Sequence, residues 1–80
     1  MSKAERAVGM VNRLAQLFGE VVTESGDVES VKMNPVDLNL LRGYECMDSD
    51  GLMWGAWFTE DPTLLPGTAS ISKLGKRMIY

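Results

Sequence analysis

The chain has 80 residues, of which 45% are hydrophobic and 24% are charged, and its formal net charge is −3. These values are typical of one small globular domain, residues 1–80, and exclude a disordered chain. The sequence has no apolar run near the roughly eighteen residues of a membrane span, so we expect no membrane association. Its single cysteine, Cys46, cannot form an internal disulfide, and we expect a cytoplasmic protein.

The sequence contains no histidine. This removes the commonest metal ligand and the commonest general base near neutral pH. With a single cysteine besides, zinc-binding spacings and Cys–His pairs are excluded. Gly75-Lys76 lacks the earlier glycine of a phosphate-binding loop. We therefore expect no metal, no cofactor and no enzymatic activity, and an enzyme working with carboxylates is the weakest of the open hypotheses.

Charge is distributed unevenly along the chain. Residues 1–19 have three cations against one acid, residues 20–61 have ten acids against two cations, and residues 62–80 have three cations and no acid. An acidic middle repels nucleic-acid phosphate and attracts basic protein surfaces. We therefore expect a protein partner with a basic surface; an ordinary solvated surface is the alternative.

Residues Ser2 to Glu20 have the pattern of a long helix. Ser2 and Glu5 have the S-x-x-E spacing of a capping box. Apolar residues then recur every three or four positions and form one stripe. The stripe consists of Ala4, Ala7, Val11, Leu14, Phe18 and Val21. We expect the helix to stop near Gly19, or Val21–Val22 to continue into a strand.

Two short segments follow. Val21–Thr23 and Val28–Met33 are rich in β-branched residues and flank a turn cluster, so they predict a hairpin across Gly26. Asn34-Pro35 then begins a second, short helix, because asparagine caps well and proline fits the first helical position. We expect this helix to end before Gly43.

The stretch Asp48–Asp61, DSDGLMWGAWFTED, contains both tryptophans of the chain. Its Asp-Ser-Asp-Gly start is a strong turn signal between Tyr44–Met47 and Leu52–Thr59, and it predicts a β-hairpin with an acidic tip. A calcium loop is excluded, because placing Gly51 at its sixth position puts a cysteine and a tryptophan where carboxylate ligands are needed.

Side chains of a strand alternate between its faces, so Trp54 and Trp57 are expected on opposite faces of Leu52–Thr59. One would pack under the N-terminal helix. The other would be covered by the Pro62–Gly67 loop, by a second subunit or by a partner. Because tryptophan dominates binding hot spots, we predict a partner-binding surface on this hairpin. Its residues are Asp48, Asp50, Trp54, Trp57, Phe58, Glu60 and Asp61.

Thr68–Ser72 is predicted to be the last strand, and Leu74–Tyr80 either extends it or forms a short terminal helix. The segment ISKLGKRMI, Ile71–Ile79, resembles the end of winged-helix DNA-binding domains, where a wing strand runs into a closing helix through a Ser or Thr cap. The resemblance covers nine residues and implies nucleic-acid contacts from a basic C-terminus. Those contacts would come from Lys73, Lys76 and Arg77. The one candidate reading helix, Pro35–Arg42, has a single basic residue.

These patterns predict an α+β fold: a long N-terminal helix packed on a small antiparallel sheet of three to four strands, with a second short helix. The predicted function is non-enzymatic binding of another macromolecule, a protein in the first place, as an inhibitor or adaptor. Small inhibitors of host enzymes encoded by phages or mobile elements have this character. A winged-helix-like DNA-binding regulator is the alternative function, and a homo-oligomer is an open alternative for the quaternary state.

Overall fold

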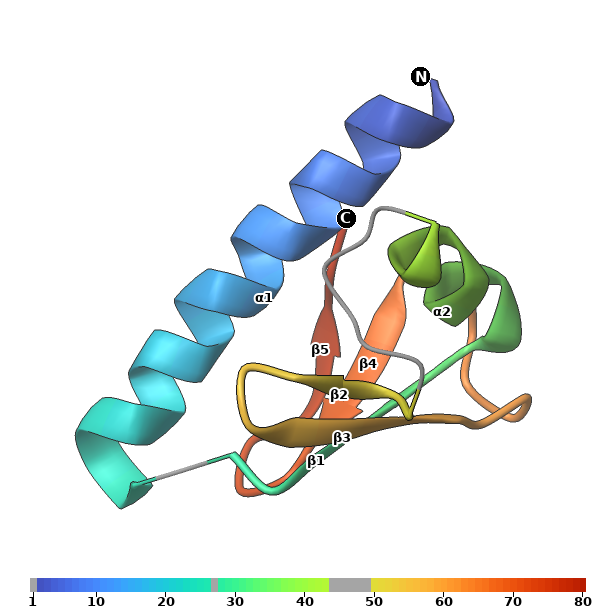
Figure 1. The fold of residues 1–80 in the computed structure, drawn as a ribbon. Helices are drawn as coiled ribbons and strands as arrows, with labels where there is room; N and C mark the ends of the chain where they lie inside the picture. Colours follow the sequence, from blue (N-terminus) through green and yellow to red (C-terminus); the bar gives the residue numbers. More distant parts are fainter. Residues whose placement is uncertain (1, 27, 44–49) are drawn as a thin grey trace.

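The computed structural model describes residues 2–26, 28–43 and 50–80. Two helices, α1 (Lys3–Ser25) and α2 (Pro35–Arg42), accompany a five-stranded sheet with the order β2-β3-β1-β4-β5 (Figure 1). The strands are β1 (Ser30–Met33), β2 (Leu52–Met53), β3 (Ala56–Glu60), β4 (Thr68–Ile71) and β5 (Gly75–Met78). The predicted α+β class is confirmed, with five strands instead of three to four.

The sheet is mixed, whereas the sequence predicted an antiparallel one. β1 runs parallel to β3 and antiparallel to β4, while β2–β3 and β4–β5 are antiparallel pairs. The parallel pair follows from the connection between β1 and β3, which contains α2. The same connection contains β2, which runs opposite to β1, and the hairpin reversal between β2 and β3 then makes β3 parallel to β1.

α1 begins as predicted, since the Ser2 hydroxyl accepts the N–H of Glu5 at 3.1 Å. It ends five residues later than Glu20, so the strand predicted over Val21–Thr23 is wrong. The reason is helical spacing: Val21 continues the apolar stripe and is buried, which a helix achieves and a strand would lose. The chain leaves the helix at Gly26, whose φ is +90°.

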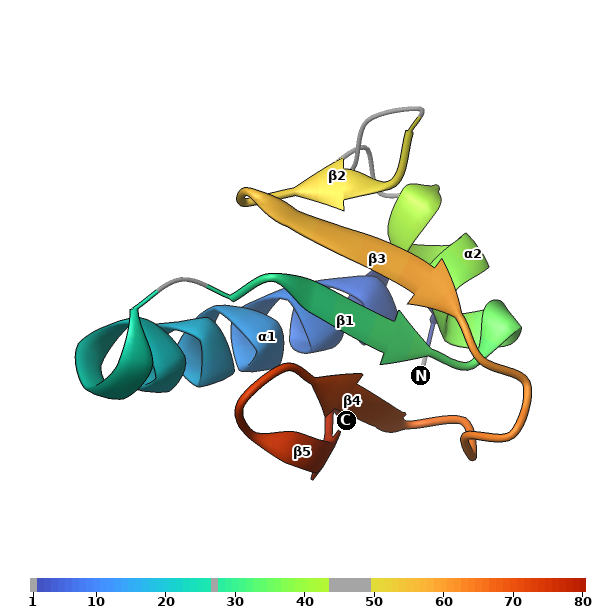
Figure 2. The same cartoon turned by 90° about the horizontal axis from the view of Figure 1, so that it is seen from below.

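The core lies between α1 and one face of the sheet (Figures 1 and 2). Side chains from α1 meet alternate residues of the central strands there. The core cluster includes Met10, Leu14, Leu17, Val21, Val31, Met33, Phe58 and Ile71, together with Leu38 and Leu41 of α2 and Ile79. Burial of these apolar side chains is the main favourable term in folding.

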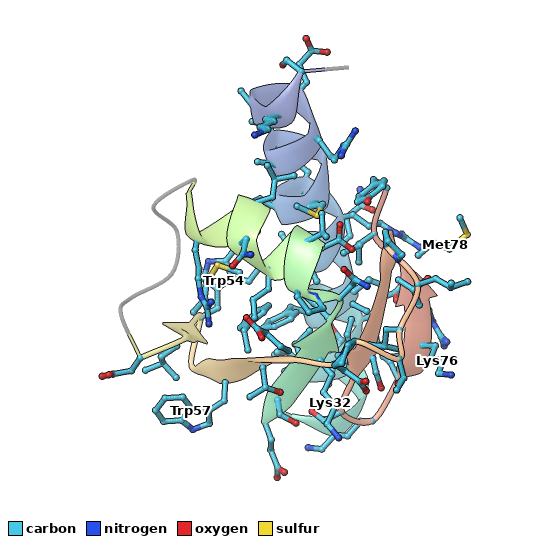
Figure 3. The ribbon with its side chains drawn as sticks, turned by 90° about the vertical axis from the view of Figure 1, so that its right-hand side faces the viewer. Lys32, Trp54, Trp57, Lys76 and Met78 are labelled. Atoms are coloured by element: carbon cyan, nitrogen blue, oxygen red, sulfur yellow. The ribbon has the colours of Figure 1, made fainter. Side chains whose placement is uncertain are left out.

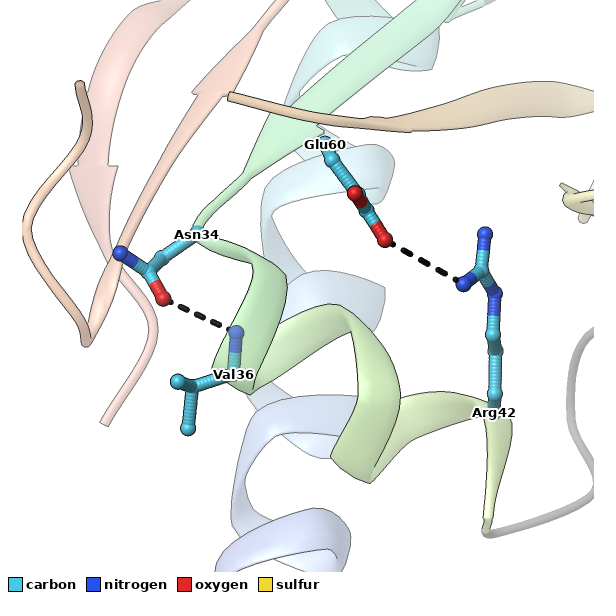
Figure 4. A network of polar contacts seen from close by, with 4 residues as sticks. All are labelled: Asn34, Val36, Arg42 and Glu60. Atoms are coloured by element: carbon cyan, nitrogen blue, oxygen red, sulfur yellow. Dashed lines mark hydrogen bonds and ion pairs between the residues drawn. The ribbon is translucent and has the colours of Figure 1, made fainter. Parts of the chain in front are cut away.

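α2 spans Pro35–Arg42, as the Asn-Pro signal predicted. The Asn34 side chain accepts the N–H of Val36 at 2.9 Å and donates to the Leu64 carbonyl at 2.8 Å. At the other end of the helix, Arg42 forms an ion pair of 3.5 Å with Glu60 of β3 (Figure 4). The Asn34 side chain that caps α2 therefore also ties this helix to the loop before β4, through its bond to Leu64.

The segment Leu52–Thr59 is not one strand. The chain reverses at Trp54-Gly55, where φ is +55° and +78°, so that β2 pairs with β3. Two consecutive positive φ values are what a tight two-residue hairpin requires, and Gly55 adopts one without strain. The hairpin predicted around Asp48–Gly51 had its first strand at Tyr44–Met47, which lies outside the described residues.

A second reversal corrects the C-terminal prediction. Leu74–Tyr80 neither extends β4 nor forms a helix. The chain turns at Lys73, with a φ of +74°, and returns as β5 alongside β4. The closing helix implied by the winged-helix likeness is therefore wrong for this chain. The predicted irregular loop between Glu60 and Thr68 is present.

Candidate binding surface

The face of the sheet opposite the core is solvent-exposed. Alternation buries Val31 and Met33 of β1 and turns Ser30 and Lys32 the other way. The registers of the neighbouring strands extend this second face across all five strands. We call it the open face. It consists of Ser30, Lys32, Leu52, Trp57, Thr59, Thr68, Ser70, Lys76 and Met78, and every one of these residues is half-buried or exposed.

Trp57 is the largest side chain on the open face. It lies in β3, opposite Leu52 of β2 and beside Ser30 of β1, and it is 52% exposed. Figure 3 shows its indole pointing away from the core, as do the side chains of Lys32, Lys76 and Met78. Its register partner on β1 is the short side chain of Ser30.

A polar row crosses the open face next to Trp57. Thr59, Lys32, Ser70 and Lys76 stand in register on four adjacent strands. Since adjacent strands lie about 4.8 Å apart, the two lysine backbones are about 10 Å apart, with Ser70 between them. The row contains two positive charges and no acid.

Asp61 lies just beyond β3, and the charges of the polar row affect its pKa. Hydrogen bonds from the hydroxyl and backbone N–H of Thr63 lower the pKa of Asp61; partial burial opposes the shift, and the charges of Lys32 and Lys76 add to it. The carboxylate of Asp61 is thus already bonded within its own loop. The two lysines create a positive potential that reaches the end of β3.

The two tryptophans do not behave as predicted. Trp54 lies in the turn between β2 and β3 and is 47% exposed, and its ring forms a T-shaped contact with Phe18 at 5.2 Å between centroids. Neither tryptophan is in the core. The prediction of one buried indole failed because the reversal at Gly55 interrupts the alternation on which it depended.

The other predicted binding residues are spread over different environments. Phe58 is buried at 3% exposure and stacks with Phe18 in the core, so it is not a surface residue. Glu60 pairs with Arg42, and Asp61 is bonded by Thr63 as described above. Asp50 is exposed. Asp48 lies outside the described residues.

The three C-terminal cations of the alternative site do not share one surface. Lys73 lies in the β4–β5 turn and Lys76 on the open face, while Arg77 is paired with Ala69 on the opposite side of β5. Lys32 is the charged residue of the open face that was not predicted from the sequence. A lysine between the apolar neighbours Val31 and Met33 was the signal, and it would have indicated a strand with one solvent-exposed face.

The outer edge of the sheet at β5 is occupied by arginines. The N–H of Ile79 donates to a carbonyl of the loop before β4, so the carbonyls of Lys76 and Met78 point away from β4. The Arg77 guanidinium donates to the first at 2.9 Å, and Arg13 of α1 donates to the second at 3.2 Å. Blocked edges discourage pairing with another strand. A partner therefore has easier access to the face than to this edge.

A buried carboxylate is a usual candidate for catalysis. Asp37 of α2 is fully buried, but both of its oxygens are engaged within the chain. Oδ2 accepts the N–H of Gly67 at 2.7 Å, and Oδ1 accepts the hydroxyl of Tyr80 at 2.8 Å. This arrangement holds the loop before β4 and the end of the chain against α2, which is a structural role.

A groove of about 600 Å³ lies between the N-terminal half of α1 and α2. Its lining combines small apolar side chains with two cations and one amide. The lining residues are Lys3, Ala4, Arg6, Ala7, Val36, Asn39, Leu40 and Gly43. No buried polar side chain lines it, so it lacks the fixed polar groups that orient a small ligand.

Within residues 2–26, 28–43 and 50–80, no three cysteine or acidic side chains lie close enough together to hold a metal ion. Neither α1 nor α2 combines the length and the apolar character that a membrane-crossing helix needs. Compared with protein-family models, curated proteins and solved structures, the chain matches none.

Proposed function

We propose that this protein binds another protein through the open face, as a non-enzymatic adaptor or inhibitor, and that Trp57 anchors the complex. The observation that carries the proposal is the 52% exposure of an indole on a sheet face that no described helix covers. Exposed aromatic surface of this kind is enriched at the centres of protein interfaces.

The neighbours of Trp57 suit an interface. Leu52 and Met78 add apolar surface at the two sides of the open face, and methionine adapts its shape to different partners. The short hydroxyl side chains between them allow a partner to approach the sheet closely. They also offer donors and acceptors that can replace lost hydrogen bonds to water.

We propose a partner charge that differs from the sequence-based expectation. Asp48, Asp50, Glu60 and Asp61 were expected to attract a basic surface. Glu60 and Asp61 are bonded within the chain, and Asp48 lies outside the described residues. The charges in the row beside Trp57 are those of Lys32 and Lys76. Complementarity across an interface therefore favours negative groups opposite them.

The experiment compares Trp57→Ser with Trp54→Ser, which removes the other half-exposed indole away from the open face. The tagged proteins are mixed with extract from the source cells, and captured proteins are identified by mass spectrometry. We expect a protein retained by wild type and Trp54→Ser and lost with Trp57→Ser. Equal capture by all three, with circular dichroism confirming that each is folded, contradicts the proposal.

Binding of single-stranded nucleic acid is the second candidate. It is favoured by one observation, the lysine row beside an exposed indole, because such surfaces combine phosphate contacts with base stacking. The net charge of −3 opposes it. A labelled oligonucleotide should show an anisotropy change that weakens with added salt, and no change at low salt excludes this function.

A further inference from the structure

Resting on the proposed function, we infer that the partner presents an extended acidic segment to Lys32 and Lys76 and an apolar side chain to Trp57. The inference reverses the partner charge that the sequence suggested. It commits the open face to one kind of occupant: a peptide segment with two acids and a neighbouring apolar residue.

The lysines are available for such a contact. The ion pair found in the described part of the chain joins Arg42 and Glu60, and neither Lys32 nor Lys76 takes part in one. Both lysines influence Asp61 electrostatically, and the carboxylate of Asp61 is bonded by Thr63. The hydroxyls of Thr59 and Ser70 stand in the same row and can donate to an incoming carboxylate.

The spacing of the lysines suggests the spacing of the acids. Two strand separations place the lysine backbones about 10 Å apart. An extended segment in the polyproline II conformation has three residues per turn and advances about 3.1 Å per residue, so acids three positions apart lie on one side of it and span nearly the same distance. Such a segment would cross the strands of the open face, and it would meet each lysine with one carboxylate.

Trp57 determines where the apolar residue lies. It precedes Thr59 of the polar row by two positions in β3, on the same face, which is about 6.6 Å along the strand. Leu52 stands opposite it on β2 and completes an apolar pair. An apolar partner side chain next to the acid that contacts Lys32 can therefore contact the indole of Trp57, while the second acid contacts Lys76.

A polyanion fits this face less well than an acidic peptide does. A single strand of nucleic acid carries a charge on every nucleotide, and its bases need successive stacking surfaces. The open face has one aromatic ring and two cations. The chain as a whole is negative, so each further phosphate is repelled. A peptide segment with two carboxylates matches the two lysines without adding further negative charge.

The test uses a display library of random twelve-residue peptides selected against immobilised protein. Wild type is compared with Lys32→Glu/Lys76→Glu, with Trp57→Ser, and with Lys3→Glu/Lys73→Glu, which makes the same change in net charge off the open face. All variants are first checked by circular dichroism and thermal melting. Peptides recovered on wild type are then synthesised, and their affinities for each variant are measured.

We expect acids to be enriched over basic residues on wild type and on Lys3→Glu/Lys73→Glu, with acids three positions apart. The Lys32→Glu/Lys76→Glu variant should bind these peptides about five- to tenfold more weakly, as two exposed charge pairs imply. The Trp57→Ser variant should also lose its affinity for these peptides.

Three results overturn the inference. The first is a wild-type pool enriched in lysine and arginine. The second is acidic peptides that bind Lys32→Glu/Lys76→Glu unchanged but fail on Trp57→Ser, which leaves the proposed function standing. The third is a labelled thymidine dodecamer that binds wild type more tightly than the best acidic peptide, which assigns the face to nucleic acid. Equal capture by Trp57→Ser in cell extract is the separate result that removes the proposed function itself.

Discussion

The hydroxyl of Tyr80 donates a hydrogen bond of 2.8 Å to Oδ1 of Asp37, 43 positions earlier in the chain. The second carboxylate oxygen accepts the N–H of Gly67 at 2.7 Å. Arg6 of α1 lies over the Tyr80 ring, with its guanidinium carbon 5.6 Å from the ring centroid. One buried carboxylate thus joins α2, the loop before β4 and the end of the chain.

Replacing Asp37 by alanine should therefore destabilise the fold. The change leaves the Gly67 N–H and the Tyr80 hydroxyl without their acceptor, and we expect a loss of about 2–4 kcal/mol in the free energy of unfolding. Urea denaturation followed by circular dichroism measures it. Tyr80→Phe, which removes one of the two bonds, should cost about 1 kcal/mol. An Asp37→Ala protein as stable as wild type contradicts this account.

Tyr80 should also make stability depend on alkaline pH. Partial desolvation and the hydrogen bond to Asp37 raise the pKa of Tyr80 above its ordinary value of 10.0, and the charge of Arg6 partly opposes the shift. A raised pKa means that the folded state favours the neutral phenol. The contribution of Tyr80 to the free energy of unfolding is complete below its unfolded-state pKa and is lost as pH rises through its folded-state pKa. Above pH 10, wild type should lose stability faster than Tyr80→Phe in urea titrations.

Trp57 and Phe58 are neighbours with opposite roles, so their alanine variants form a matched pair. Phe58 is in the core, and Phe58→Ala should cost about 3–5 kcal/mol. Trp57→Ala should change the free energy of unfolding by less than about 1 kcal/mol, because half of the indole already contacts water. Thermal melting of the two variants separates these cases. A larger loss for Trp57→Ala would show that the indole packs within the fold.

Gly51 and Gly55 both have positive φ but differ in their surroundings. A Cβ at Gly51 would lie 3.0 Å from the backbone oxygen of Phe58, whereas a Cβ at Gly55 meets nothing within 4 Å. Gly55→Ala should cost about 1–2 kcal/mol from backbone strain alone. Gly51→Ala should cost more, because the β2–β3 hairpin must also shift. Equal losses in urea denaturation would contradict the predicted crowding at Gly51.

The arginines on the β5 edge should limit self-association. Arg13→Ala together with Arg77→Ala exposes the outward carbonyls of Met78 and Lys76, which another strand can then pair with. We expect a concentration-dependent increase in mass by analytical ultracentrifugation. Arg42→Ala, which removes an exposed ion pair elsewhere, is the control and should stay like wild type. An unchanged double variant would show that this edge needs no protection.

The sequence by itself determined the elements whose signals are local. The capping box at Ser2, the apolar stripe and the Asn34-Pro35 start predicted both helices, because helical spacing and capping depend on neighbouring residues. Together with the turn signals they also predicted the α+β class. Val28–Met33 was predicted to be a strand, and β1 lies there over Ser30–Met33. Phe58, predicted to contact a partner, lies in the core instead.

Only the tertiary structure decided which side chains share a surface. Val21 stayed helical because the core covered it, which no β-propensity could reveal. The reversals at Gly55 and Lys73 moved Trp54 off the sheet and turned the C-terminus into an edge strand. Lys32 and Lys76, 44 positions apart, became neighbours in one row only because β4 pairs with both of their strands. The physical reason is that strand pairing is non-local: hydrogen bonds and burial over the whole chain select it, and a short stretch of sequence does not contain that information.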